Sequence, residues 1–174
     1  MEKEVTIKQS LNTATLAKAM TYILFTSPIA YLYCIIYVVF LLNFLLTISN
    51  PFNLPDGGPD SFSTPLAAFT IAPLFFLIMR NFFAKKAIEK NSRFYTNVLY
   101  TFSTKSFRKE GEGFNIVLKW NEIKKIKESK EWFLLYVNSQ QAHIVDKSQL
   151  SPGQKDELKD TFKSVQSITK VSLI

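Results

Sequence analysis

Two long stretches without a charged side chain constrain this sequence more than any other feature. No Asp, Glu, Lys or Arg occurs from Ala19 to Pro55 or from Ser61 to Met79, and only two aspartates separate the stretches. A helix of roughly 20 apolar residues is long enough to cross the hydrocarbon core of a bilayer. The sequence therefore predicts a transmembrane helical hairpin in residues 21–80, with a short extracytoplasmic loop at about residues 50–61.

The apolar pattern at the start of the hairpin is longer than a bilayer requires. A helix beginning at Asn12 or Thr13 and continuing to Ile48 would be about 54 Å long, against a core of ~30 Å. We therefore place the first span at roughly Tyr22–Thr47 and the second at Ser61–Met79, and we expect Pro28 to kink the first span near its start. Residues 1–20 are then an N-terminal strand and a pre-membrane segment. The apolar run is too long for a cleaved signal peptide.

The charges that flank the two spans predict their orientation. The connecting loop has no Lys or Arg, whereas the second span is followed by a basic cluster in which Glu89 is the only acid: Arg80, Lys85, Lys86, Lys90 and Arg93. Cytoplasmic loops carry the excess of positive charge. We expect a membrane protein with two spans and both termini in the cytoplasm. Arg80, Lys85 and Lys86 are also candidate contacts for anionic lipid, with an ordinary topology signal as the alternative.

Residues 81–174 have the pattern of a small domain built on an antiparallel sheet. Apolar residues alternate with polar ones in several short runs separated by turn-forming residues, which is typical of strands in close succession. The run Trp132–Val137 is apolar on both faces and is expected to be a central strand. The other runs are Val98–Phe102, Phe114–Trp120 and Ala142–Val145.

The sequence also predicts a C-terminal helix and leaves two segments open. Ser151-Pro-Gly-Gln154 fits a capping box with Pro at the first helical position, and an apolar stripe follows at Leu158, Phe162 and Val165. Val5–Ile7 alternates like a strand, and whether it joins the C-terminal sheet stays open. Ser167–Ile174 is either a frayed end or a short final strand.

The second half of the chain resembles the YcxB-like domain family. The resemblance is carried by Tyr100-Thr-Phe102, by Val117-Leu-Lys-Trp-Asn-Glu-Ile-Lys-Lys-Ile126, by Trp132-Phe-Leu-Leu-Tyr136 and by the Ser151 helix start, and it covers roughly residues 94–165. The family plan is two transmembrane helices followed by a domain similar to bacterial pleckstrin-homology folds. The resemblance thus implies a membrane α+β protein: a helical hairpin, then a small PH-like antiparallel sheet with one C-terminal helix. It implies no reaction.

Residues suited to catalysis or metal binding are scarce. Cys34 is the only cysteine and His143 the only histidine, and no phosphate-binding glycine loop or metal-ligand motif is present. His143 is expected at the surface or against a partner, and Glu128 and Glu131 are expected to be solvated beside a turn. We therefore expect no enzyme, no catalytic residue, no cofactor and no metal.

Lysines and tryptophans of the second half are the remaining candidates for contact with a lipid or partner. From Arg80 onward 18 Lys and Arg stand against 10 Asp and Glu, an excess that suits anionic headgroups. Nucleic acid is the weaker explanation because a two-span anchor accompanies the charge, so none is expected. Trp120 and Trp132 are stacking candidates, with a core position as the alternative. The candidate lysines are Lys119, Lys124, Lys125, Lys127 and Lys130.

These observations predict a non-enzymatic binding protein of the bacterial inner membrane. The most specific hypothesis, by analogy of fold and size, is an immunity protein that neutralises a cognate secreted toxin by direct binding. The alternatives are a lipid-responsive envelope sensor and a structural subunit of a membrane complex. Expected partners are the bilayer, a protein (the toxin or the complex) and anionic lipid.

Overall fold

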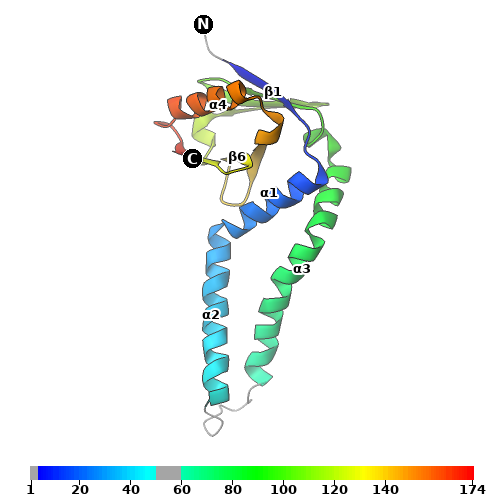
Figure 1. Ribbon diagram of the computed structural model, residues 1–174, viewed down its shortest axis with the longest axis vertical. Helices are drawn as coiled ribbons and strands as arrows, with labels where there is room; N and C mark the ends of the chain where they lie inside the picture. The colour runs from blue at the N-terminus through cyan, green and yellow to red at the C-terminus, as the bar shows by residue number, and fades with distance from the viewer. Residues whose placement is uncertain (1–3, 50–59) are drawn as a thin grey trace. The chain divides into compact units, whose positions relative to one another are not determined.

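The computed structural model describes residues 4–49 and 60–174 (Figure 1), so the predicted loop at about residues 50–61 falls almost wholly outside the described residues. Contacts divide the chain into two compact units. The first unit, here called the sheet module, combines Met1–Ile23 with Asn81–Ile174. The second, here called the helical pair, is Leu24–Arg80. The helical pair is thus inserted into the sequence of the sheet module.

The sheet module contains two four-stranded sheets instead of the single predicted sheet. Sheet A has the order β1-β2-β3-β4 and is antiparallel throughout, and sheet B has the order β7-β6-β5-β8. The strands are β1 (Val5–Gln9), β2 (Val98–Phe102), β3 (Ser106–Gly111), β4 (Phe114–Lys119), β5 (Lys125–Glu128), β6 (Trp132–Tyr136), β7 (Ala142–Asp146) and β8 (Lys170–Ser172).

Strand β8 shows that the C-terminal segment ends in a short strand, and it corrects the expectation of a purely antiparallel sheet. Residues Lys170–Ser172 form β8, which pairs parallel to β5, so the sheet is not antiparallel throughout. A parallel pair needs a long crossover connection. Here the chain passes through β6, β7 and helix α4 (Pro152–Ser164) before it returns beside β5. The predicted combination of antiparallel sheets with a C-terminal helix is confirmed in other respects (Figure 1).

The N-terminal strand belongs to the sheet of the second half of the chain. Val5 lies opposite Phe102 and Gln9 opposite Val98 in an antiparallel ladder. Gln9 is 2% exposed and ties this strand to sheet B as well. Its side-chain amide donates to the Asp146 carbonyl oxygen at 2.7 Å, and its Oε1 accepts from the Asp146 N–H at 3.1 Å. A side chain thereby provides the two bonds that a neighbouring strand would provide.

The main core lies between the two sheets and is closed by α4. Ser151 caps this helix as predicted, because its Oγ accepts from the Gln154 N–H at 3.2 Å and the Gln154 side chain accepts from the Ser151 N–H at 3.0 Å. Phe162 projects from α4 against several rings of the core. Their centroids lie 5.4–6.2 Å from its own, and they belong to Phe102, Trp120 and Phe133.

A second apolar cluster covers the outer face of sheet B. Helix α1 (Thr13–Phe25) buries Leu16, Ala17 and Ala19 there, and Ala84 near the C-terminal end of α3 (Asp60–Lys90) joins them. Alanines let backbones approach closely. With one core on each side, all five residues of β6 are buried, which confirms the prediction of a central strand. The first turns of the predicted pre-membrane helix therefore pack on protein.

The helix boundaries differ from those predicted. The span expected at Tyr22–Thr47 is interrupted between Phe25 and Pro28, where α1 ends and α2 (Pro28–Ser49) begins. Proline lacks the N–H needed to continue a helix. Ser27 closes the interruption, since its Oγ donates to the Leu24 carbonyl at 2.7 Å. Helix α3 extends to Lys90, past the predicted end at Met79.

Among the described residues, no single helix combines the length and hydropathy of a membrane span, whereas Thr13–Phe25 and Ala30–Asn43 meet that standard as a bent pair. The two predicted spans accordingly remain a proposal.

Candidate functional site

The tryptophans predicted as contact candidates are largely core residues. Trp120 begins a 3-10 turn after β4, is 1% exposed, and donates its indole N–H to the Ser103 carbonyl at 3.0 Å. A ligand could stack on Trp120 only if the core opened. Trp132 is also buried, with its ring edge-on to Tyr22 at 5.8 Å between centroids. It nevertheless lines a surface cavity.

The predicted lysines are spread over several surfaces of the sheet module. Lys125 and Lys127 alternate with buried residues along β5, and each ammonium lies over a ring, Tyr136 at 5.2 Å and Tyr22 at 4.9 Å. Burial, and then the positive charges of Lys127 and Lys170, lower the pKa of Lys125.

The remaining predicted cations do not form one site. Lys119 and Lys124 are exposed near the turn around Trp120, and Lys85 and Lys86 are exposed on α3. Lys85 makes a solvated ion pair with Glu89 at 3.8 Å. Arg80 belongs to the helical pair, whereas the other candidate residues belong to the sheet module.

Glu128, expected in solvent, is the most tightly held carboxylate described. Its side chain is 1% exposed and binds the ammonium groups of Lys147 at 2.6 Å and Lys159 at 3.0 Å. It also accepts from the Ile174 N–H at 2.8 Å. Burial raises the pKa of Glu128, but these hydrogen bonds outweigh burial and bring the pKa below its ordinary value.

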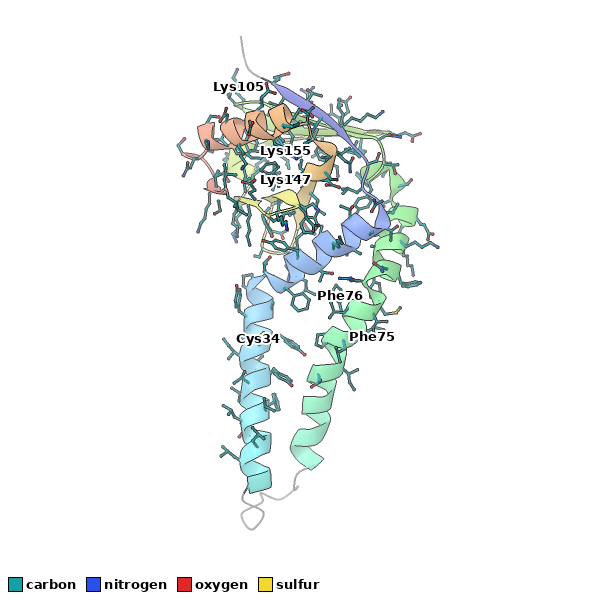
Figure 2. The ribbon with its side chains drawn as sticks, in the orientation of Figure 1. Cys34, Phe75, Phe76, Lys105, Lys147 and Lys155 are labelled. Atoms are coloured by element: carbon teal, nitrogen blue, oxygen red, sulfur yellow. The ribbon has the colours of Figure 1, made fainter. Side chains whose placement is uncertain are left out.

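A lysine-lined cavity of about 460 Å³ lies on the sheet module. We call it the lysine cavity. It is lined by the first turns of α1, by the turn between β5 and β6, by the residues after β7 and by the start of α4. Figure 2 labels Lys147 and Lys155, two of its members. Its charged residues are Lys18, Lys130, Lys147, Lys155, Glu131 and Asp146.

The acids around the lysine cavity do not cancel its charge. Asp146 Oδ1 accepts from both the N–H and the hydroxyl of Ser148, at 2.8 and 2.7 Å. Lys147 forms an ion pair with Glu128, which does not line the cavity. Lys18, Lys130 and Lys155 make no ion pair in the described part of the chain. Three ammonium groups that form no ion pair line one cavity, and this arrangement favours the binding of an anion.

The lining of the lysine cavity is suited to binding an anion. The described residues contain no group of three metal-ligating side chains. The hydroxyl of Ser148 is bound to the Asp146 carboxylate, which also caps the following 3-10 turn by accepting from the Ser148 N–H. Lysine ammonium groups and the polar side chains of Asn12, Thr15 and Ser148 can hold a phosphate or carboxylate by charge and hydrogen bonds.

The sequence predicted only part of this cavity. Lys130 and Trp132 were expected as contact residues, whereas Lys18, Lys147 and Lys155 were not. Each of these three is an ordinary surface lysine in its own segment, and only the packing of α1 and α4 beside the β5–β6 turn brings them together. Glu128 had a local signal, since it shares a strand face with Ile126.

Comparison with known proteins gives one match. The family model described as YcxB-like protein matches residues 102–162, which confirms the resemblance predicted from the sequence. The matched segment runs from the last residue of β2 into α4, entirely within the sheet module. No curated protein and no solved structure gave a match.

Proposed function

Starting from the YcxB-like segment at residues 102–162, we propose that this chain is a non-enzymatic binding protein of the bacterial inner membrane. Its helical pair would be the anchor, and its sheet module would recognise an anionic group at the cytoplasmic surface. The lysine cavity carries this proposal, because three ammonium groups without an acidic partner converge on it.

Two observations support the membrane anchor and its orientation. Nearly all of the helical pair falls in the two uncharged stretches, and basic residues follow it. The sheet module contains residues from before and after the helical pair, joined by the β1–β2 ladder. The chain must therefore return to the side from which it left, which agrees with two spans and cytoplasmic termini.

The lysine cavity is suited to an anionic lipid headgroup. Lys18 precedes Leu24, the first residue of the helical pair, by six positions, so chain connectivity alone keeps the two within about 20 Å. Basic side chains near a membrane surface gain roughly 1 kcal/mol each from anionic lipid. We therefore favour the lipid-responsive role among the functions predicted from the sequence.

A soluble short-chain lipid tests this role without confusing it with anchoring. Dihexanoyl phosphatidylglycerol, added to the full-length protein in neutral detergent, should raise the melting temperature, whereas dihexanoyl phosphatidylcholine should not. A triple variant, Lys18→Gln, Lys130→Gln and Lys155→Gln, should lose this effect. The matched control neutralises three lysines outside the cavity, Lys119, Lys124 and Lys163, and should keep it. Equal losses in both triple variants would contradict the proposal.

A protein partner is the second candidate, and the open edge of sheet A favours it. Strand β4 lies at the end of the sheet order, and Asn115, Val117 and Lys119 are exposed along it. An exposed edge strand can pair with a strand from another chain. The specific form of this proposal is the immunity role, in which the partner is a cognate secreted toxin; a subunit of a membrane complex is the other form.

Affinity capture of the tagged protein from gently solubilised membranes, followed by mass spectrometry, tests the partner. One stoichiometric protein, retained by the natural chain and lost when Val117→Pro blocks the β4 edge, would support a protein-binding role. A toxin as that protein would support the immunity role. Recovery of anionic lipid alone would contradict both the protein-binding role and the immunity role.

A further inference from the structure

A buried lysine without an acidic partner lies on the inner face of sheet A. Lys109 is in β3, opposite Tyr100 on one side and Ile116 on the other, and is 8% exposed. Within the described residues its ammonium has neither an ion-pair partner nor a hydrogen-bond acceptor. Buried ammonium groups are normally paired, because desolvating an isolated charge is costly.

The side chain of Lys109 lines a cavity of about 350 Å³, separate from the lysine cavity. We call it the Lys109 cavity. Its walls come from β2, β3 and β4 of sheet A, from β7 of sheet B, and from the segment that follows α3. Apart from Lys109, its polar residues are Asn91, His143 and two tyrosines, and no carboxylate lines it. The remaining lining is aromatic and aliphatic: Leu11, Phe94, Ile116, Ala142 and Ile144.

The rings around Lys109 do not replace the missing partner. The centroids of Phe94, Tyr95, Tyr100 and Phe114 lie 5.7–6.0 Å from its Nζ, at the outer limit of a cation–π contact. Burial lowers the pKa of Lys109 to about 8, as expected when no anion compensates the charge. At neutral pH the ammonium therefore remains charged and poorly solvated.

His143 gives the Lys109 cavity a second polar group. Its ring packs against Phe107 at 5.2 Å between centroids, and burial together with the charge of Lys109 lowers the pKa of His143 to about 4. It is thus neutral at pH 7 and can donate one hydrogen bond. His143, predicted at the surface or against a partner, is half-buried and lines this cavity.

We propose that the Lys109 cavity is a binding site for a single carboxylate carried on an aromatic or branched apolar body. The Lys109 ammonium would bind the carboxylate, His143 or Asn91 would donate a hydrogen bond to it, and the aromatic walls would hold the apolar part. One positive charge matches a monoanion better than a phosphate dianion. Cavities of a few hundred Å³ with apolar walls and few polar groups are typical ligand sites. This site does not depend on the proposed function of the lysine cavity.

Titration of the full-length protein in neutral detergent tests the proposal. Reductive ¹³C-methylation of the lysines gives one NMR signal for each, and Lys109→Gln identifies the signal of Lys109. The probes are benzoate and N-acetylphenylalanine, with benzyl alcohol and N-acetylphenylalaninamide as uncharged counterparts. We expect both acids to shift the Lys109 signal saturably and to raise its pKa by about one unit, a tenfold preference for the charged lysine. The uncharged counterparts should do neither.

Two variants separate this site from nonspecific attraction of anions. Lys109→Gln should weaken binding of the acids at least tenfold, whereas Arg108→Gln, which removes a charge from the exposed face of the same strand, should not. Tighter binding of N-acetylphenylalanine than of benzoate would favour a peptide C-terminus as the source of the carboxylate. Tighter binding of benzoate would favour a small organic acid. A Lys109 signal that neither acid shifts, or equal weakening by the two substitutions, would overturn the proposal.

Discussion

At the residue scale, Lys109 destabilises the unliganded fold in which it is buried. Its pKa falls from 10.5 to about 8 on folding, so the unfolded chain binds this proton more tightly. The folded state is therefore disfavoured below pH 8, by an amount on the order of 3 kcal/mol, and the effect disappears as the pH rises past 10.5.

Replacing Lys109 with Met should consequently stabilise the protein at pH 7. We expect about 1–3 kcal/mol, since the Met side chain suits the apolar walls, and a clearly smaller gain at pH 10. Thermal or urea unfolding in the same detergent at the two pH values measures this difference. A variant less stable than the natural chain at pH 7 would show that the ammonium is well accommodated.

Glu128 has the opposite effect, because it is buried with two cations. Its lowered pKa means that the carboxylate stabilises the fold above its ordinary pKa of 4.5, and that this contribution is lost as the pH falls below that value. Glu128→Gln would leave Lys147 and Lys159 without their shared anion. We expect a loss of about 3 kcal/mol in the free energy of unfolding at pH 7.

Glu131→Gln is the matched control for Glu128, since Glu131 lies across the same turn and is exposed. It should change stability by less than about 0.5 kcal/mol. Comparable losses in the two variants would mean that Glu128 is held no more firmly than a surface residue.

At the scale of elements, Gln9 joins β1 to β7 through its side chain. Gln9→Leu keeps the volume but leaves the Asp146 N–H and carbonyl without their partner. We expect a loss of about 2 kcal/mol, the penalty for unsatisfied buried backbone groups. Urea unfolding measures it, with Lys8→Ala on the exposed face of β1 as the control. A loss of unfolding free energy no greater than that of Lys8→Ala would show that the two Gln9 hydrogen bonds to Asp146 do not stabilise the fold.

The elements that the sequence predicted well have strong local signals. The apolar run Trp132–Tyr136 indicated a central strand, and Ser151 with Gln154 indicated the start of α4. Strands β3 and β5 were not predicted, because Lys109 and Glu128 occupy positions where an apolar residue would complete the alternation. The kink expected at Pro28 also has a local signal, and the structure places a break between two helices directly before this proline.

The two cavities could not be predicted from local pattern. Lys18 and Lys155 come from opposite ends of the chain, and the Lys109 cavity needs both sheets. These residues meet only because β1 pairs with β2 and α4 closes the core. Pairing across such separations depends on the whole fold, whereas alternation and capping depend on a few neighbouring residues.

At the scale of the whole molecule, the proposed topology can be measured directly. Single cysteines placed at Lys8 and at Ser167, in a Cys34→Ser background, should resist a membrane-impermeant thiol reagent in intact spheroplasts and react after lysis. Both positions are exposed in the sheet module. A cysteine at Gly57 in the predicted loop should react in intact spheroplasts. Labelling of Lys8→Cys or Ser167→Cys before lysis would contradict cytoplasmic termini.

The ladder between β1 and β2 also sets an order on the synthesis of the protein. Val5 emerges from the ribosome first, yet its partner Phe102 follows only after both uncharged stretches. The first strand must therefore stay unpaired until both stretches have been made. Under the proposed topology, a chain that inserted only one of the two stretches would leave β1 and β2 on opposite sides of the membrane, unable to pair. Closure of sheet A would then distinguish a chain with both crossings from a chain with one.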